Sequence, residues 1–511
     1  MALQLFAVID IGSFDLELAI YEINSKGRMN RLESIVYNIA LGNDTYEHGS
    51  IGYELLDSLC EHLLKFKDII KGYGIEDRDI KVFATSAMRE AKNRIVVEDQ
   101  IKVRCGLSVD IMSNSQQRFL SYKAIPLYLE GYSDIISRES AIVDVGFGSV
   151  QVSLYGGGHL KSTQNIRLGA LRIQAMLDRM AVHNQDYRLI TEELVDREVE
   201  DFSTYFLAEK KPESIIAVGD CTRVFAAKIL GFKGSGAIPA EDYFGIYETV
   251  SSMRPPELAS AFDLPVGFSH LILPIAMIYY RILATTGAKM LYITGTSLCD
   301  GIAADLGESR KLIKTDHDFK EDIISSAREL NKRFRPESRH LQMIEEITAS
   351  IFDATKKVHG LSKREKLLLQ ISAILHEVGH YVNITAPGTA GYDIIIATEI
   401  LGISHLEREI VANAVKYTTE PLEEYGGSEF SKEMYMIVYR FSAILRLANL
   451  LDRSHKQKFM GSNISVKDNK LIISIDTDEN ISLEKGLLAG RTSYFKEAFG
   501  LEPEIVVKRK R

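Results

Sequence analysis

The chain has 511 residues, more than one hydrophobic core can organise, so we expect about two to four domains. Hydrophobic residues make up 46% of it, as in ordinary globular proteins, and its net charge of −9 argues against broad binding of duplex nucleic acid. Its four cysteines are far apart and form no CxxC pair, which favours a reduced, cytoplasmic setting. We find no signal-peptide pattern, and no apolar run that approaches the roughly 18 residues of a membrane span.

The N-terminal part of the chain starts with a strand and a glycine turn. The apolar residues 5–9 predict a buried strand, which breaks at Asp10-Ile-Gly-Ser-Phe-Asp15. Backbone N–H groups in such a turn can face a phosphate, while the aspartate holds a metal ion or water. A second copy, Asp144-Val-Gly-Phe-Gly-Ser149, also follows an apolar strand. Two copies in the same order indicate a cleft between paired lobes.

Strands and helices alternate along most of the first three hundred residues. Residues 80–84 form a predicted strand that leads into a helix start with Thr85 and Arg89, a combination that suits an anion. Strands at 214–218 and 290–293 are followed by further turns rich in Gly, Ser and Thr. This alternation predicts an α/β fold.

After about residue 306 the pattern changes. Residues 311–454 show helical spacing almost throughout, and residues 461–511 return to strand-like alternation with one helix expected at 486–499. We therefore predict an N-terminal lobe at 1–128, a second lobe at 129–306, a helical domain at 307–460 and a small β-rich segment at 461–511.

Several segments, in this order, resemble the signatures of the exopolyphosphatase/guanosine pentaphosphate phosphohydrolase (Ppx/GppA) family. The family belongs to the actin/hexokinase-like (ribonuclease H-like) superfamily. The resemblance covers nearly the whole chain and implies two actin-like lobes, then an HD-type helical domain. The matching segments are Asp10-Ile-Gly-Ser13, Ala84-Thr-Ser-Ala-Met-Arg-Glu-Ala-Lys-Asn93, Asp144-Val-Gly-Phe-Gly-Ser149, Leu168-Gly-Ala-Leu-Arg172, Gly219-Asp-Cys-Thr222, Leu375-His-Glu-Val-Gly379 and Tyr494-Phe-Lys-Glu-Ala-Phe-Gly500.

The resemblance implies hydrolysis of a terminal phosphoanhydride, in inorganic polyphosphate or in guanosine pentaphosphate, with Mg²⁺ as cofactor. Phosphoryl transfer of this kind depends on positioning, on charge stabilisation and on one base that orients water. The implied metal ligands are Asp10 and Asp144, and the implied catalytic positions are Asp10, Gln117, Asp144 and Gln151. The implied phosphate-binding residues are Gly12, Ser13, Thr85, Arg89, Gly146, Gly148 and Ser149.

This chain departs from the family pattern where the chemistry is expected. Gln117 stands where the family has its presumed base, and Gln151 replaces an acidic residue. An amide cannot accept a proton, and loss of a general base typically costs about 10²–10⁴ in rate. Phe14 and Phe147 replace smaller residues of the two phosphate loops. Asp15 adds a negative charge where phosphate is expected, and Cys299 takes the place of a common arginine.

The helical domain also departs from an HD metal site. Its only candidate pair is His376-Glu377, with His380 expected on the same helix, and the usual histidine and aspartate partners are missing from the segments where the family has them. Packed core histidines are the simpler interpretation, so we expect no metal ion in this domain.

Two functional hypotheses remain open at this point. In one, the chain is an active phosphoanhydride hydrolase that uses Asp10, Asp15 or Asp144 in place of the lost glutamates. In the other, it is an inactive relative that binds a phosphate-rich ligand or a partner and acts as a regulator. In both, the ligand is polyphosphate or a guanosine polyphosphate, no membrane is involved, and a homodimer is expected.

Overall fold

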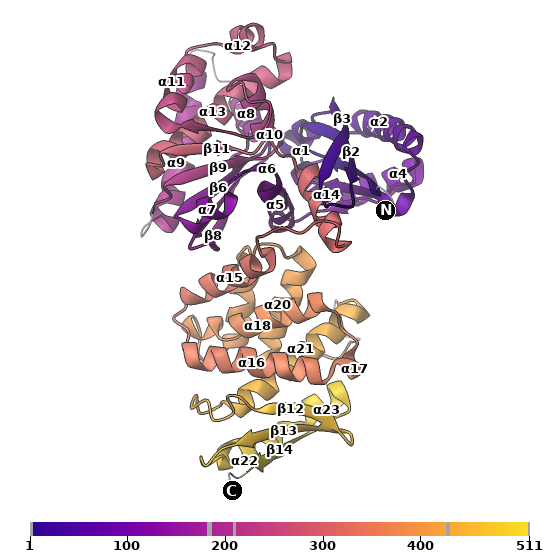
Figure 1. Cartoon of the computed structure of the whole chain (residues 1–511), viewed down its shortest axis with the longest axis vertical. Helices are drawn as coiled ribbons and strands as arrows, with labels where there is room; N and C mark the ends of the chain where they lie inside the picture. The colour runs from indigo at the N-terminus through magenta and orange to yellow at the C-terminus, as the bar shows by residue number, and fades with distance from the viewer. Residues whose placement is uncertain (1–3, 181–185, 208–210, 426–429, 509–511) are drawn as a thin grey trace. The chain divides into compact units, whose positions relative to one another are not determined.

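The computed structural model describes residues 4–180, 186–207, 211–425 and 430–508 (Figure 1). The chain forms two compact units, Met1–Asp322 and Ile323–Arg511. The first holds two α/β lobes, each built on its own sheet, and the second holds helices followed by a small sheet. The two α/β lobes and the following helical domain confirm the fold class predicted from the sequence.

The first lobe is built on a five-stranded sheet of order β3-β2-β1-β4-β5. An antiparallel meander joins β1, β2 and β3, and β4 and β5 continue parallel to β1. Helix α2 buries residues at helical spacing, such as Leu59, Leu63 and Phe66, in a common core with the sheet. The elements are β1 (Gln4–Ile11), β2 (Asp15–Ile23), β3 (Met29–Asn38), β4 (Ile80–Ala84), β5 (Asp110–Ile111), α1 (Leu41–His48), α2 (Tyr53–Gly72), α3 (Ser86–Glu90), α4 (Arg94–Cys105), α5 (Asn114–Lys123) and α6 (Ile125–Tyr128).

The second lobe repeats this plan on a six-stranded sheet of order β10-β11-β9-β6-β7-β8. Strands β6, β7 and β8 form the antiparallel meander, and β9 and β11 run parallel to β6. The elements are α7 (Tyr132–Ser137), β6 (Ser140–Val145), β7 (Val150–Gly156), β8 (His159–Ile166), α8 (Ala170–Arg179), α9 (Tyr187–Phe206), β9 (Ser214–Val218), α10 (Asp220–Lys228), β10 (Gly236–Pro239), α11 (Ala240–Ser251), α12 (Pro255–Phe262), α13 (Val266–Thr286) and β11 (Met290–Ile293).

Helix α14 (Leu298–Ser309) follows the last strand of the second sheet but packs against the first. Its residues Leu298, Cys299 and Ile302 share a core cluster with Val8 and Tyr21 of β1 and β2. Cys299, at the position where the family commonly has arginine, is completely buried there. The chain therefore crosses back to the first lobe before it leaves the unit.

Two helices have the length and mean hydropathy of a membrane span, so the expectation that no apolar run approaches that length is wrong. They are Gly267–Thr286 within α13 and Lys432–Leu451, and 72% and 56% of their apolar windows are buried inside the protein. In α13, buried residues such as Leu271, Ile275 and Ile282 belong to the core of the second lobe. Core helices pass the same length and hydropathy criteria as membrane spans, so these two helices are only weak evidence of a membrane.

The second unit packs helices around one another and ends in a three-stranded sheet of order β12-β13-β14. The single helix expected at 486–499 is in fact two, because α22 stops at Arg491 and α23 starts at Ser493. The elements are α15 (Phe319–Lys332, which begins in the first unit), α16 (Ser338–Ala354), α17 (Lys356–His359), α18 (Lys363–Leu375), α19 (Pro387–Ala397), α20 (His405–Thr419), α21 (Lys432–Leu451), β12 (Asn463–Lys467), β13 (Lys470–Asp476), α22 (Ser482–Arg491), α23 (Ser493–Phe499) and β14 (Glu502–Lys508).

Candidate functional site

The two sheets present equivalent pairs of polar residues at their first hairpins. In the first lobe Asp10 of β1 lies opposite Glu17 of β2, and in the second lobe Asp144 of β6 lies opposite Gln151 of β7. The parallel neighbour of β6 is β9, whose end leads directly to Asp220. Because parallel strands end at the same edge of a sheet, each lobe gathers polar groups at one edge.

These edges enclose a cavity of about 50 Å³. It holds a few water molecules or one hydrated ion, since a single water needs roughly 10–15 Å³ measured in this way. Apart from Arg89, every site residue predicted from the sequence lines it: Asp10, Gly12, Ser13, Thr85, Gln117, Asp144, Gly146, Gly148, Ser149 and Gln151.

The hydroxyl of Ser13, a predicted phosphate donor, is already engaged inside the protein. Its Oγ lies 2.9 Å from the hydroxyl of Tyr46 and 2.8 Å from Oγ of Ser86, and it accepts a hydrogen bond from the backbone N–H of Ala87. All three hydroxyl-bearing side chains are buried. A phosphate could use these groups only after displacing Tyr46.

Three phenylalanines close the space between the two phosphate loops. The rings of Phe14 and Phe147 stack with centroids 5.0 Å apart, and both contact Phe268 of α13 edge-on. Phe14 and Phe147 are 7% and 8% exposed, although they come from different lobes. Burial of each ring contributes about 1.5–3 kcal/mol. These two substitutions therefore hold the lobes together where the phosphate chain is expected.

Buried carboxylates dominate the electrostatics of the cavity. Burial, and then repulsion from Asp220, raise the pKa of Asp15 and of Asp144 to about 7. Burial also raises the pKa of Asp10 well above its ordinary value, with Asp220 and Glu17 adding to the effect. Oδ1 of Asp10 is buried without a hydrogen-bond partner. The cavity is thus short of positive charge.

A magnesium ion fits this donor set, because Mg²⁺ prefers carboxylate oxygens and keeps several waters. Asp10 and Asp144 are the residues that would hold it, and Asp220 lies close enough to Asp144 to raise its pKa. In the described part of this unit, no three His, Cys or carboxylate ligand atoms lie within 4.8 Å of one another. The protein would therefore supply only one or two ligands, and water the rest.

A buried arginine stands beside the amide that replaced the second acidic residue. Arg118 of α5 is fully buried, and its Nε donates to Oε1 of Gln151 over 2.6 Å. It also donates to the hydroxyl of Thr163. Its charge lowers the pKa of Asp144, against the stronger effect of burial. A fixed guanidinium therefore supplies positive charge at this end of the cavity.

The arginine predicted to clamp phosphate points elsewhere. Arg89 donates to the backbone carbonyl of Met112 over 2.6 Å and to the side chain of Asn114, and it is not among the residues that line the cavity. Arg172 donates to the carbonyl of Gly148 and pairs with Glu90 over 2.8 Å. Both guanidinium groups have partners within the protein.

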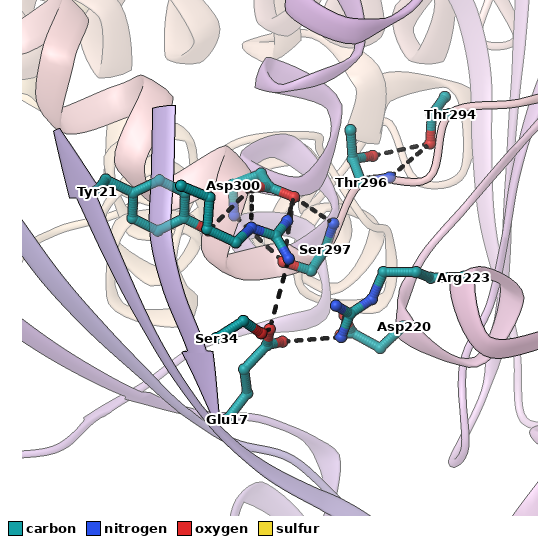
Figure 2. A network of polar contacts seen from close by, with 10 residues as sticks. Glu17, Tyr21, Ser34, Asp220, Arg223, Thr294, Thr296, Ser297 and Asp300 are labelled. Carbon is teal, nitrogen blue, oxygen red and sulfur yellow. Dashed lines mark hydrogen bonds and ion pairs between the residues drawn. The ribbon is translucent and has the colours of Figure 1, made fainter. Parts of the chain in front are cut away.

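A second polar cluster joins the lobes through Glu17 and Asp300 (Figure 2). Arg223 of α10 donates to Oε2 of Glu17 over 3.1 Å. Asp300 of α14 is completely buried and accepts from the hydroxyl of Tyr21 and from Arg31. Figure 2 shows Tyr21 and Ser297 beside Asp300, and Asp220 beside Arg223. The Glu17–Arg223 ion pair thus crosses between the lobes, while Asp300 ties α14 to the first lobe.

A much larger cavity, of about 720 Å³, adjoins this cluster. Four basic side chains are among its lining residues: Arg28, Arg31, Arg223 and Lys233. Arg31 and Arg223 belong to the ion pairs described above, whereas the exposed Arg28 and Lys233 have no ion pair among the described residues. Tyr128 and Phe232 add aromatic surface. This cavity can accept a ligand of nucleotide size with negative charge.

Glu17, Arg118, Asp220 and Arg223 are functional candidates that the sequence analysis did not single out. Glu17 follows Asp10 by the same seven positions that separate Gln151 from Asp144. That repeated spacing could have identified it. The burial of an arginine at position 118 gave no signal in the sequence, since surface helices commonly carry arginine.

In the second unit, the structure contradicts the expected position of His380. Helix α18 ends at Leu375, and a 3₁₀ turn at Val378–Tyr381 holds His380, which is exposed. His376 is buried instead beside His340 of α16, a partner that the sequence analysis missed. Burial lowers the pKa of His376 to about 4, so its ring is neutral.

Comparison with known proteins assigns the chain to a family. The sequence pattern of the Ppx/GppA phosphatase family matches residues 19–267, and that of Ppx/GppA phosphatase domain III matches residues 324–491. The chain belongs to the Ppx/GppA phosphatase family. The resemblance stated from the sequence motifs is therefore confirmed.

Three proteins to which the chain is similar are distant in sequence. A guanosine-5'-triphosphate,3'-diphosphate pyrophosphatase of Photobacterium profundum is 20% identical over 92% of this chain and 91% of its own length. A bifunctional 3-dehydroquinate synthase/phosphatase of Fusobacterium nucleatum is 23% identical over 38% of this chain, which spans only 31% of that protein. A solved exopolyphosphatase from Cytophaga hutchinsonii superposes with a TM-score of 0.54 at 18% identity, over 61% of this chain and all of that one. At such identities the structural likeness establishes the Ppx/GppA fold alone.

Proposed function

We propose that this member of the Ppx/GppA family binds a polyphosphate or guanosine polyphosphate between its lobes without hydrolysing it, and acts as a regulator. The observation that carries the proposal is the pair of amides at positions 117 and 151, with Arg118 bonded to Gln151. Neither amide can take a proton from water. The guanidinium of Arg118 lies directly beside Gln151, at the position where the family has an acidic residue.

The ligand is proposed to bind in the larger cavity rather than the smaller one. A cavity of about 50 Å³ has no room for a phosphate chain, whereas one of about 720 Å³ does. Arg28 and Lys233 offer charges that are not paired within the described chain. Phosphate ligands are held by such side chains through charge-assisted hydrogen bonds.

Two assays on the purified chain test this proposal. Release of phosphate from polyphosphate and from guanosine pentaphosphate is measured with Mg²⁺ or Mn²⁺, and binding of both compounds is measured by calorimetry. We expect binding without release. The double variant Arg28→Ser, Lys233→Ser should weaken binding at least tenfold, whereas a matched change of two exposed charges, Lys71→Ser with Arg94→Ser, should not.

A slow hydrolase is the second candidate, because Asp15 and Asp144 have pKa values of about 7. A general base works best with a pKa near the working pH. Robust turnover that Asp144→Ala abolishes would favour this candidate over the first. A gain of activity in the double variant Gln117→Glu, Gln151→Glu would instead show that the two amides are what removed the chemistry.

Three further parts of the proposal concern the surroundings of the protein. We propose Mg²⁺ at Asp10 and Asp144, supported by the unpartnered oxygen of Asp10. A cytoplasmic location is supported by four buried, unpaired cysteines, Cys60, Cys105, Cys221 and Cys299. We also propose that two copies of the chain form a homodimer, as expected from the sequence; a monomer in light scattering would contradict this.

A further inference from the structure

Three side chains of the second unit bring potential ligand atoms together. His340 of α16, and His376 and Glu377 just after α18, each place one ligand atom within 4.8 Å of those of the other two. The two histidines are 1% and 7% exposed. We expected no metal ion in this helical domain because the sequence showed no partner for His376; the structure supplies His340.

The hydrogen bonds of the two rings assign their protons. Nδ1 of His340 lies 2.8 Å from Oδ2 of Asp452, and Nδ1 of His376 lies 2.7 Å from the carbonyl oxygen of Ala373. Both partners are acceptors, so each Nδ1 carries a hydrogen. In a neutral ring the other nitrogen then has a lone pair. With both rings neutral, the Nε2 atoms of His340 and His376 are the ones that can bind a metal ion.

The two Nε2 atoms face each other at 3.3 Å, and Oε1 of Glu377 lies 3.6 Å from Nε2 of His340. Three electron-pair donors around one point repel one another unless a cation lies between them. With metal–nitrogen distances of about 2.1 Å, this separation gives an N–metal–N angle of about 100°, close to the tetrahedral value that zinc prefers.

We propose that His340, His376 and Glu377 bind a divalent transition-metal ion of the zinc class, with one coordination position left for water. Imidazole and carboxylate are the donors that such ions take in tetrahedral sites. Among the described residues, no fourth His, Cys or carboxylate joins this group. This site is separate from the carboxylate cavity of the first unit and does not depend on the proposed function.

The groups behind the ligands keep the rings in place. Asp452 is completely buried, accepts a hydrogen bond from the backbone N–H of Gln457 and orients His340. The ring of His455 stacks on His340 with centroids 3.8 Å apart, while its Nδ1 bonds to Glu337. A carboxylate behind a metal-bound histidine typically improves affinity about 10–100-fold. Asp452 is thus a positioning residue.

The test uses the full chain after removal of metal by a chelator. Co²⁺ is titrated in, the absorption bands of tetrahedral cobalt are recorded, and Zn²⁺ is added as competitor. We expect one such Co²⁺ per chain, displaced by Zn²⁺. His340→Gln and His376→Gln should each abolish the bands, and Asp452→Asn should weaken binding about 10–100-fold with the band shape retained. Circular dichroism confirms that each variant is folded.

Two controls make the result decisive. His380→Gln, the neighbouring exposed histidine, should leave the titration unchanged, and so should Asp144→Asn, which removes a carboxylate of the first unit. Absence of tetrahedral bands in the wild type, or equal binding by folded His340→Gln, would overturn the proposal. Loss of the bands in His380→Gln would show that the donor set is wrong.

Discussion

Replacing Asp144 with asparagine tests whether the cavity in the first unit is crowded with negative charge. The carboxyl group is buried and has a pKa of about 7, mainly because of burial and then because of Asp220. Its folded pKa lies above the ordinary value of 3.8, so the folded state binds the proton more tightly than the unfolded state. Stability from this group is complete below about pH 4 and is lost as the pH rises to about 7.

The magnitude follows from that difference. At about 1.4 kcal/mol per pKa unit, the ionised group costs up to about 4 kcal/mol above pH 7, and roughly 2 kcal/mol of this appears between pH 5 and pH 7. Asparagine keeps the shape of the side chain but never ionises. Asp144→Asn should therefore be more stable than the wild type at pH 8, with a much smaller advantage at pH 5.

Unfolding by urea, followed by circular dichroism at pH 5 and pH 8 with a chelator present, measures this difference. Asp263→Asn is the matched control, because the side chain of Asp263 is fully exposed; its effect should not depend on pH. The reasoning is refuted if Asp144→Asn is equally stabilising at both pH values, or destabilising at pH 8. Added Mg²⁺ should stabilise the wild type at pH 8 more than the variant.

Three further substitutions test other parts of the first unit. Phe147→Ala should lower the free energy of unfolding by about 3–5 kcal/mol, measured by urea titration, because it leaves a hole between the lobes; an unchanged midpoint would contradict the proposed role of the aromatic cluster. Arg31→Met should lower the free energy of unfolding by about 3–5 kcal/mol, because it leaves Asp300 buried without its cation. Adding Asp300→Asn should restore part of this loss in the same urea titration. Gly219→Ala should cost at least about 1–3 kcal/mol in thermal unfolding, because the backbone has a φ of 100° and a Cβ would meet Oδ1 of Asp144; wild-type stability would refute this.

The fold was predictable because its signals are local. The apolar run before Asp10 and its repeat before Asp144 identify the first strands of two related lobes. Helical spacing in residues such as Leu59, Leu63 and Phe66 identifies α2. The break between α22 and α23 was missed, because apolar spacing continues across Thr492, where the helix is interrupted.

Only those residues of the candidate site that belong to a local sequence motif could be predicted. Asp10 and Asp144 lie in glycine turns that the sequence displays directly. The pairing of His376 with His340 depends on how two helices pack, and thirty-six positions separate them. Likewise, nothing in the sequence shows that Phe14 and Phe147 stack on each other, since they are far apart in the chain and belong to different lobes.

The return of α14 to the first sheet has a consequence for synthesis of the chain. Val8 and Tyr21 leave the ribosome nearly three hundred residues before Leu298 and Ile302, which belong to the core that covers them. This face of the first sheet is covered only after α14 has been synthesised. A nascent chain therefore exposes an apolar sheet face throughout the synthesis of its second lobe, and this exposed surface is a binding site for chaperones during that period.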